Sequence, residues 1–192
     1  MPKRCATSDT RVPAKPRSIT TLHVVSRISC RRSSTVCRFT QQNIVSVVMA
    51  LTLDDVRSDS KRYGPLAWVA TVSPSGTPYA SPVAVAWHGD TILAFLATPE
   101  AKVSNVRSNP RVSVHFAVSA DTDWDSCVVW GRGRVVDDTA GRKSLWDKMG
   151  YDCNVFEPGG PAADSHVFLV VEPTRAVILR NYGLKGKDSW RL

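Results

Sequence analysis

Tight turns divide much of the chain into short runs of β-forming residues, and this spacing is the strongest restriction on its fold. Pro74-Ser75-Gly76 separates a run at 66–73 from one at 79–87, and His88-Gly89-Asp90 separates that run from one at 91–97. Connections of this length join neighbouring strands only in the antiparallel sense. The sequence therefore predicts an antiparallel meander at this point of the chain.

The same pattern continues towards the C-terminus. Further β-forming runs follow at 111–119, 126–136, 167–171 and 175–179. Gly131 and Gly133 lie inside the second of these runs, where glycine indicates a bulge or a close backbone approach. We therefore expect six or more short strands in all.

Three short helices are predicted among the strands. Thr52 is expected to cap the first. Thr98 is expected to cap the second, with Pro99 at its first helical position. The third is expected to run from Asp137 to about Met149. Many short antiparallel strands with only small helices predict a mainly β fold of the barrel type.

Residues 1–48 differ in composition from the rest. They hold nine of the 25 basic residues and one of the 17 acidic residues, so they carry the whole formal charge of +8. They show no sustained periodicity and few large apolar groups. We expect a basic, structureless extension at 1–48 and a folded domain at 49–192.

Three interpretations of the extension stay open. Translation begins at Met49, or at Val47 or Val48; or the segment is an organelle-targeting peptide, which is typically rich in Arg and Ser; or it is an arm that binds nucleic acid. The part from Met49 onward is formally neutral. Its charge therefore gives no reason to expect a nucleic-acid partner for the domain.

The cysteines indicate a reduced setting. Three of the five lie in the extension, and Cys127 and Cys153 lie in the domain without a C-x-x-C pair. An odd total does not fit a disulfide framework, so we expect a cytoplasmic protein with two inert buried thiols.

Apolar runs such as 167–171 are far shorter than the roughly 18 residues that a membrane helix needs, so no membrane partner is expected.

Standard catalytic and metal-binding motifs are absent. We find no G-x-S-x-G, P-loop, G-x-G-x-x-G or H-E-x-x-H pattern. The histidines are scattered at His23, His88, His115 and His166. We therefore expect no metal site. We expect the core or a dimer interface, not a cofactor stack, for Trp68, Trp87, Trp130 and Trp146.

One segment, 97–112, has the composition of an anion site. A strand leads into a short helix whose free N–H groups and dipole favour an anion. Lys102 and Asn105 lie three residues apart, so they share one helix face. A cation beside an amide suits a phosphate or a polar ligand tail. The competing interpretation is that Lys102 and Arg107 form the solvated side of the helix.

The order of these elements resembles the pyridoxamine 5′-phosphate oxidase-like family of flavin-binding split barrels. The resemblance covers about residues 53–190. It is carried by the strand at 80–87 with its G-D turn, the K-x-x-N-x-R-x-x-P-R-V segment from Lys102, the G-R-G-R-V-V strand at 131–136, and the Trp-ended tail. It implies a six-stranded antiparallel split β-barrel with a few short helices. It also implies a homodimer with two interface sites for FMN or the related deazaflavin, coenzyme F-420.

The resemblance also implies roles for particular residues. Lys102 would be the cation for the cofactor phosphate, Thr98 a hydroxyl near it, and Asn105 would fix the local backbone. The isoalloxazine ring would be lined by Ser81, Pro82 and Val83. Trp190 and Arg191 would approach from the partner subunit. No catalytic residue is assigned.

The chain departs from true pyridoxamine phosphate oxidases in its basic residues. The Arg-rich phosphate-binding segment is reduced to Lys102 and Arg107, and residues 190–192 only loosely match the C-terminal substrate-binding element. These features are closer to the branch of the family that uses the deazaflavin.

The sequence therefore predicts a cofactor-dependent oxidoreductase in which the ring passes a hydride to or from a small conjugated substrate. Tyr79, Lys185 and Lys187 are weak candidates for an acid or base. The alternative is a non-catalytic split barrel that stores or senses a flavin or haem. A third interpretation is a nucleic-acid-associated protein that works through the basic arm.

Overall fold

The computed structural model describes residues 50–116 and 118–192. The predicted extension at 1–48 and the expected start at Met49 lie outside the described residues. Helix α1 (Leu53–Ser60) begins the described fold. The Asp55 N–H donates to Thr52 Oγ1 at 3.2 Å, and the Thr52 N–H donates to the Asp55 carboxylate at 3.1 Å. This reciprocal pair is a capping box, which confirms the predicted cap.

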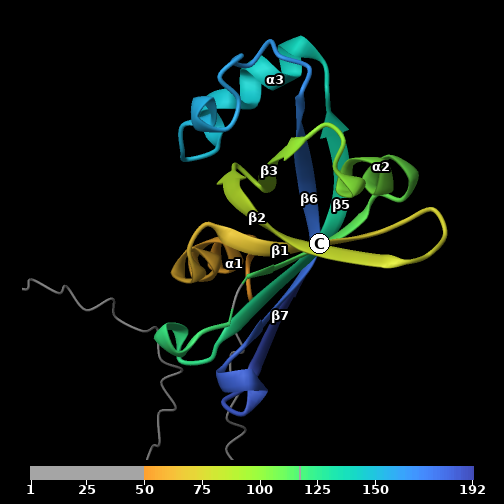
Figure 1. The fold of residues 1–192 in the computed structure, drawn as a ribbon. Helices are drawn as coiled ribbons and strands as arrows, with labels where there is room; N and C mark the ends of the chain where they lie inside the picture. Colours follow the sequence, from red (N-terminus) through yellow and green to blue (C-terminus); the bar gives the residue numbers. More distant parts are fainter. Residues whose placement is uncertain (1–49, 117) are drawn as a thin grey trace, which may run out of the picture. The chain divides into compact units, whose positions relative to one another are not determined.

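Seven antiparallel strands form one sheet in the order β3-β2-β1-β4-β5-β6-β7. They are β1 (Leu66–Val72), β2 (Pro78–His88), β3 (Thr91–Ala97), β4 (Arg111–Phe116), β5 (Ser126–Val136), β6 (His166–Leu179) and β7 (Lys187–Arg191). An additional pairing of β3 with β6 closes the first six strands into a barrel (Figure 1). The predicted six-stranded barrel is confirmed, with one further strand added at its edge.

The prediction of two strands at 167–171 and 175–179 is wrong, because β6 is continuous through Pro173. The register between β5 and β6 shifts between Trp130 and Gly131, and this bulge allows the proline to lie opposite Gly131. A Cβ atom on Gly131 would lie 2.3 Å from the Glu172 carbonyl oxygen. The predicted bulge and close approach at this glycine are therefore confirmed.

The predicted start of the second helix is also wrong. Helix α2 (Ala101–Ser108) has Glu100, not Thr98, as its N-cap. The Thr98 N–H donates to the Ser165 carbonyl at 2.8 Å, and its hydroxyl donates to the Asp164 carbonyl at 2.7 Å. These bonds to a distant loop hold Thr98 before the helix. Pro99 consequently lies outside the helix as well.

Helix α3 (Thr139–Leu145) begins after Asp138, whose side chain accepts from the Gly141 N–H at 2.7 Å. It is shorter than predicted, since a separate 3-10 turn, η3 (Trp146–Lys148), follows it. A second such turn is η4 (Cys153–Val155). In Figure 1 this whole segment lies at the opposite end of the barrel from β7.

The apolar residues form two clusters. The larger one fills the barrel with inward side chains of β1 to β6 and receives Val56 from α1 and Val103 and Val106 from α2. The second lies outside the barrel. It packs residues of β3 and β6 against Trp146, Met149 and Cys153 of the α3–η4 segment. These helical pieces therefore cover the outer side of β3 and β6.

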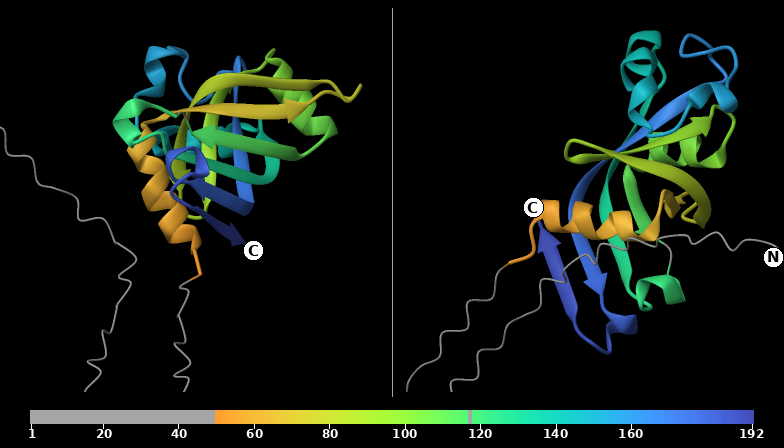
Figure 2. Two further views of the ribbon diagram at one scale, coloured as in Figure 1. Left: turned by 90° about the horizontal axis from the view of Figure 1, so that it is seen from below. Right: turned by 90° about the vertical axis from the view of Figure 1, so that its left-hand side faces the viewer.

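A charged network joins α1 to the far end of β6. Arg180 contacts Asp59 at 2.7 Å and Asp125 at 2.9 Å, and Arg62 contacts the same two carboxylates at 3.0 Å each. Burial alone would raise the pKa of Asp125. It is outweighed by the Asn181 N–H and the two guanidinium groups, which hold that pKa below its usual range. Figure 2 shows α1 beside the strands that it joins.

Among the described residues, we find no helix with the length and apolar character needed to span a membrane.

Candidate functional site

The site begins at an open strand edge. β2 pairs with β1 along 78–84, but it pairs with β3 only from Val85 to His88. In the described part of the chain, no strand pairs with 78–84 on the side away from β1. The Val85 N–H donates to the Pro65 carbonyl on the β1 side at 2.7 Å. Because backbone groups alternate along a strand, Pro82 and Ala84 direct theirs towards the open side.

A pocket of about 330 Å³ lies beside this edge, within the usual size range of small-molecule sites. Most of its lining is apolar or aromatic: Pro82, Val83, Ala84, Phe95, Ala97, Glu100, Tyr151 and Phe156. Tyr151 and Phe156 come from the loop after α3 and pack edge to face, with ring centroids 5.6 Å apart. Burial raises the pKa of Tyr151 to about 12, so its hydroxyl remains a hydrogen-bond donor at neutral pH.

Lys102 contacts Glu100, which lines this pocket, and its side chain is only 3% exposed. Its ammonium donates to Ser81 Oγ at 2.7 Å and lies 2.5 Å from a carboxylate oxygen of Glu100. The Tyr79 ring centroid is 5.6 Å away. The interpretation of Lys102 as a solvated surface lysine is therefore wrong. A buried lysine requires partners, and Glu100 and Ser81 supply them.

Asn105 is 4% exposed and connects α2 to the sheet. Its amide donates to Thr71 Oγ1 of β1 at 3.0 Å, and this contact is fully buried. The bond fixes α2 against the strand that pairs with β2. Asn105 is therefore placed to hold the helix backbone next to Lys102.

The eight predicted cofactor-binding residues fall into separate places within one protomer. The structure brings Ser81 and Lys102 into contact and sets Pro82 and Val83 in the adjoining pocket. Thr98 precedes the same helix, but its hydroxyl donates a hydrogen bond to the Asp164 carbonyl in the loop before β6. Trp190 and Arg191 are on β7, where Trp190 packs against the main core and Arg191 lies opposite Arg175.

The weaker acid–base candidates also lie in separate places. Tyr79 is 40% exposed and faces Lys102, whereas Lys185 and Lys187 are exposed residues at the β6–β7 turn and on β7. Both described cysteines are buried free thiols. Burial raises the pKa of Cys127 to about 12 and also raises that of Cys153, so neither is a ready nucleophile.

Sequence reasoning missed several residues of the site. Glu100 is only two residues from Lys102 in sequence, but the pattern gives no reason to expect the two to pair. Phe95, Tyr151 and Phe156 carry no local signal, because their place in the pocket depends on how the α3–η4 segment returns to β3. Thr71 is identifiable only from its bond to Asn105.

The residues fit an anion joined to a flat group with a polar rim. Lys102 supplies the buried cation, and the unpaired backbone of β2 supplies donors and acceptors beside apolar walls. Glu100 is the competing anion. Its side chain is 35% exposed, and one of its oxygens also accepts from the Ala97 N–H at 3.0 Å, so another anion at Lys102 would have to displace it.

The family model for pyridoxamine 5′-phosphate oxidase matches residues 58–179, which include both Lys102 and the pocket. The chain belongs to the pyridoxamine 5′-phosphate oxidase family. The resemblance predicted from the sequence is thereby confirmed. An uncharacterised protein of Rhizobium meliloti (strain 1021) is 32% identical over 108 residues, covering 50% of this chain and 71% of that protein.

Several solved structures share the fold. A protein from Clostridium acetobutylicum, related to general stress protein 26 of B. subtilis, has a TM-score of 0.61 at 14% identity, covering 74% of this chain and 97% of its own. A haem-binding protein of Mycobacterium smegmatis has a TM-score of 0.57 at 17% identity, with 75% and 60% covered. A pyridoxamine 5′-phosphate oxidase-related, FMN-binding protein of Nostoc punctiforme has a TM-score of 0.50 at 15% identity, with 75% and 99% covered.

Proposed function

We propose that this protein is an oxidoreductase that uses FMN or the deazaflavin coenzyme F-420 and transfers a hydride to or from a small conjugated substrate. The observation that carries the proposal is the buried Lys102, bonded to Ser81 at the open edge of β2 and adjoining an apolar pocket. Membership of the pyridoxamine 5′-phosphate oxidase family and the FMN-binding relative from Nostoc punctiforme support it.

The chain would hold the cofactor through residues of α2, of β2 and of the segment that joins β3 to α2. Lys102 of α2 would bind its phosphate after Glu100 turns away, and Thr98 would offer its hydroxyl oxygen nearby. Asn105 would keep α2 against β1 through Thr71. The ring would lie against Ser81, Pro82 and Val83 of β2.

The bound cofactor supplies the hydride chemistry, and the protein supplies position and exclusion of water. The open side of β2 offers backbone donors and acceptors to the polar rim of the ring. Phe95, Tyr151 and Phe156 would shield the ring from water. Tyr151 remains protonated at neutral pH, so it can donate a hydrogen bond to a substrate oxygen or nitrogen.

We further propose that two chains form a homodimer through the outer face of β1 and β2. Leu66 and Trp68 are 57% and 48% exposed there, and Trp68 lies opposite the exposed Pro82. Large apolar side chains grouped on one exposed face favour association. In such a dimer, Trp190 and Arg191 would reach the cofactor of the partner subunit. The buried free thiols support a reducing, cytoplasmic setting.

Cofactor binding tests the proposal directly. Wild-type protein is expected to bind FMN or F-420 at micromolar concentration, measured by flavin absorbance and by quenching of deazaflavin fluorescence. Lys102→Ala should weaken binding at least about tenfold, because a charge-assisted hydrogen bond is lost. Glu100→Gln should tighten binding, because it removes the competing carboxylate.

Arg107→Ala is the matched control, since Arg107 lies on the same helix but is 49% exposed and pairs with Asp137. It should leave cofactor affinity unchanged. The proposal is wrong if neither cofactor binds at micromolar concentration, or if Lys102→Ala behaves like the control. Knowing which of the two cofactors binds would also show which class of substrate to test.

The second candidate is a non-catalytic module that stores or senses a flavin or haem. The haem-binding protein from Mycobacterium smegmatis has the same fold, which supports this alternative. A cofactor that binds but never turns over with nicotinamide or quinone-like acceptors would support the module. Turnover with any such acceptor would exclude it.

A further inference from the structure

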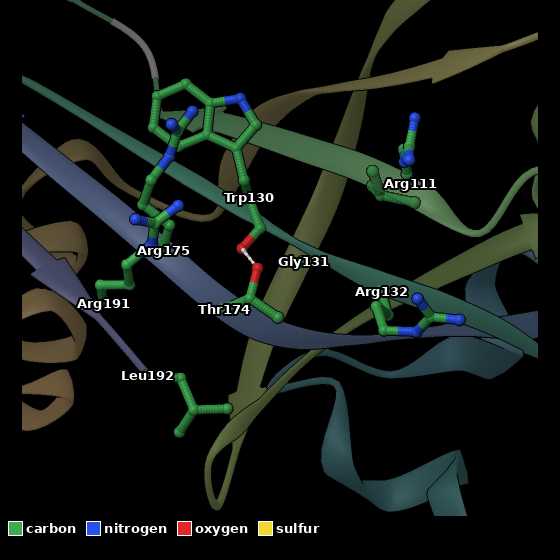
Figure 3. A pocket seen from close by; sticks show the side chains of 9 residues that line it. Arg111, Trp130, Gly131, Arg132, Thr174, Arg175, Arg191 and Leu192 are labelled. Atoms are coloured by element: carbon green, nitrogen blue, oxygen red, sulfur yellow. Dashed lines mark hydrogen bonds between the residues drawn. The ribbon is translucent and has the colours of Figure 1, made fainter.

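A second pocket, of about 540 Å³, lies on the outer face of β4 to β7 and is lined by four arginines (Figure 3). Arg111 comes from β4, Arg132 from β5, Arg175 from β6 and Arg191 from β7. Each strand of this face thus contributes one guanidinium group. No acidic side chain lines the pocket.

The register places these arginines opposite one another. Arg111 is directly opposite Arg132, and Arg175 is directly opposite Arg191. Like charges directly opposite across two strands are destabilising, and their Cβ atoms are about 5 Å apart. The sheet therefore holds two adjacent pairs of like charges on one face.

No acidic side chain of the described residues forms an ion pair with these four arginines. Across residues 50–116 and 118–192, the observed ion pairs of arginine involve other side chains, namely Arg57, Arg62, Arg107, Arg134 and Arg180. The nearest acid by register is Glu172, opposite Arg132, and its carboxylate lies 4.0 Å from Arg134 instead. The four guanidinium groups thus have no acidic side-chain partner within the described residues.

Trp130 orients Arg175, one member of the second pair. Its indole lies under the Arg175 guanidinium, 4.0 Å from ring centroid to Cζ, and the Thr174 hydroxyl donates to its carbonyl oxygen at 3.3 Å. A guanidinium stacked on an aromatic ring keeps its N–H edge free for hydrogen bonds. Figure 3 shows Arg175 beside this ring, with Arg111 and Arg132 on the other side of the pocket.

We infer that this pocket binds a small polyanion through phosphate or carboxylate groups, one group for each arginine pair. Arginine binds both kinds of group in a bidentate manner. The two pairs are centred two strand spacings apart across the sheet. They are also offset by two residues along it, because Arg175 lies opposite Trp130 and not Arg132, so their centres are about 12 Å apart. A single phosphate spans one pair only, whereas a ligand with two or more separated anionic groups engages both.

This site is separate from the one proposed at Lys102, because the two pockets share no residue. Arg191 is also assigned to the partner's cofactor in the proposed dimer. The test therefore uses arginines of the other three strands. Its outcome does not depend on whether a flavin or deazaflavin binds.

The experiment is calorimetric titration of full-length protein with three probes: orthophosphate, tripolyphosphate and a tetra-aspartate peptide. One or both polyanions should bind at least about tenfold more tightly than orthophosphate, and the better probe identifies the ligand source as phosphate or carboxylate. Arg111→Gln, Arg132→Gln and Arg175→Gln should each weaken polyanion binding at least about tenfold. These side chains are exposed, so the variants should fold, and near-UV circular dichroism checks this.

Arg134→Gln is the matched control, because Arg134 lies on β5 two residues from Arg132 but outside the pocket. It and Lys102→Ala should leave polyanion affinity unchanged. The inference is overturned if Arg134→Gln weakens binding as much as Arg132→Gln, which would indicate diffuse attraction. It is also overturned if orthophosphate binds as tightly as the polyanions, if Lys102→Ala abolishes binding, or if single-stranded DNA binds far more tightly at the same residues.

Discussion

His166 is the most isolated polar side chain of the described fold. It is 1% exposed, and neither ring nitrogen has a hydrogen-bond partner among the described residues. Its imidazole stacks on Phe95 at 5.0 Å and lies 5.1 Å from the Trp146 ring. Burial lowers its pKa, the nearby Arg142 lowers it further, and Glu157 partly opposes them. His166 is therefore neutral in the native state at neutral pH.

This environment predicts a loss of stability in mild acid. An unfolded histidine binds a proton below a pH of about 6.5, whereas native His166 does not, so the unfolded state gains protons first. The free energy of unfolding should be nearly constant between about pH 7 and about pH 8 and should fall below about pH 6.5, by up to about 1.4 kcal/mol per pH unit. Urea unfolding across this range measures the slope.

His166→Leu should flatten this slope, because it removes the buried titrating group. Burial also lowers the pKa of His115, so a smaller slope of the same sign should remain. An unchanged slope in His166→Leu would assign the acid sensitivity to other groups.

The β5–β6 bulge determines the path of the longest strand. At Gly131 the β5 backbone approaches the Glu172 carbonyl so closely that no side chain fits. Gly131→Ala should therefore lower the free energy of unfolding by about 1–3 kcal/mol, since the two strands must move apart. Thermal or urea unfolding measures the change.

Ser189→Ala on the exposed β7 is a suitable control and should change stability by less than about 0.5 kcal/mol. Equal stability of Gly131→Ala and wild type would mean that the bulge rearranges freely. The basic pocket lies over the same bulge, so a variant that moves the strands should also weaken polyanion binding.

Elements defined by local turn chemistry were predictable from the sequence. The bounds of β3 and β5 match the predicted runs at 91–97 and 126–136, because each is bordered by turn or loop residues. Thr98 failed as a cap because its partners, Asp164 and Ser165, lie more than 60 residues away. No sequence pattern close to Thr98 indicates such a distant contact.

Some residues of the candidate site were likewise predictable from the sequence, and others were not. Lys102 and Asn105 could be singled out from their spacing, and the family resemblance added Ser81 and Pro82. The aromatic side of the pocket could not be predicted, since Tyr151 and Phe156 reach it only through the packing of the α3–η4 segment on β3 and β6. The burial of Lys102 likewise depends on β2, 21 residues away.

At the scale of the whole molecule, the proposed dimer depends on the exposed apolar face of β1. Trp68→Glu should dissociate it, because a carboxylate would then be buried on the apolar face of β1. Sedimentation velocity should show a dimer for wild type and a monomer for the variant. Cofactor affinity should fall together with dimerisation if Trp190 and Arg191 act across the interface.

Leu184→Glu is the control for this prediction, since Leu184 is 86% exposed in the turn before β7. It should remain dimeric. A wild-type monomer, or a dimer that survives Trp68→Glu, would place the interface elsewhere.

The one-sided pairing of β2 also bears on aggregation. Unpaired strand edges are templates on which other chains add strands, and native proteins blunt them with proline or charge. Pro82 removes a donor from the open row of β2 at its centre, and the ammonium of Lys102 lies beside it. The same two residues that would receive a ligand therefore also discourage edge-to-edge growth of the sheet while no ligand is bound.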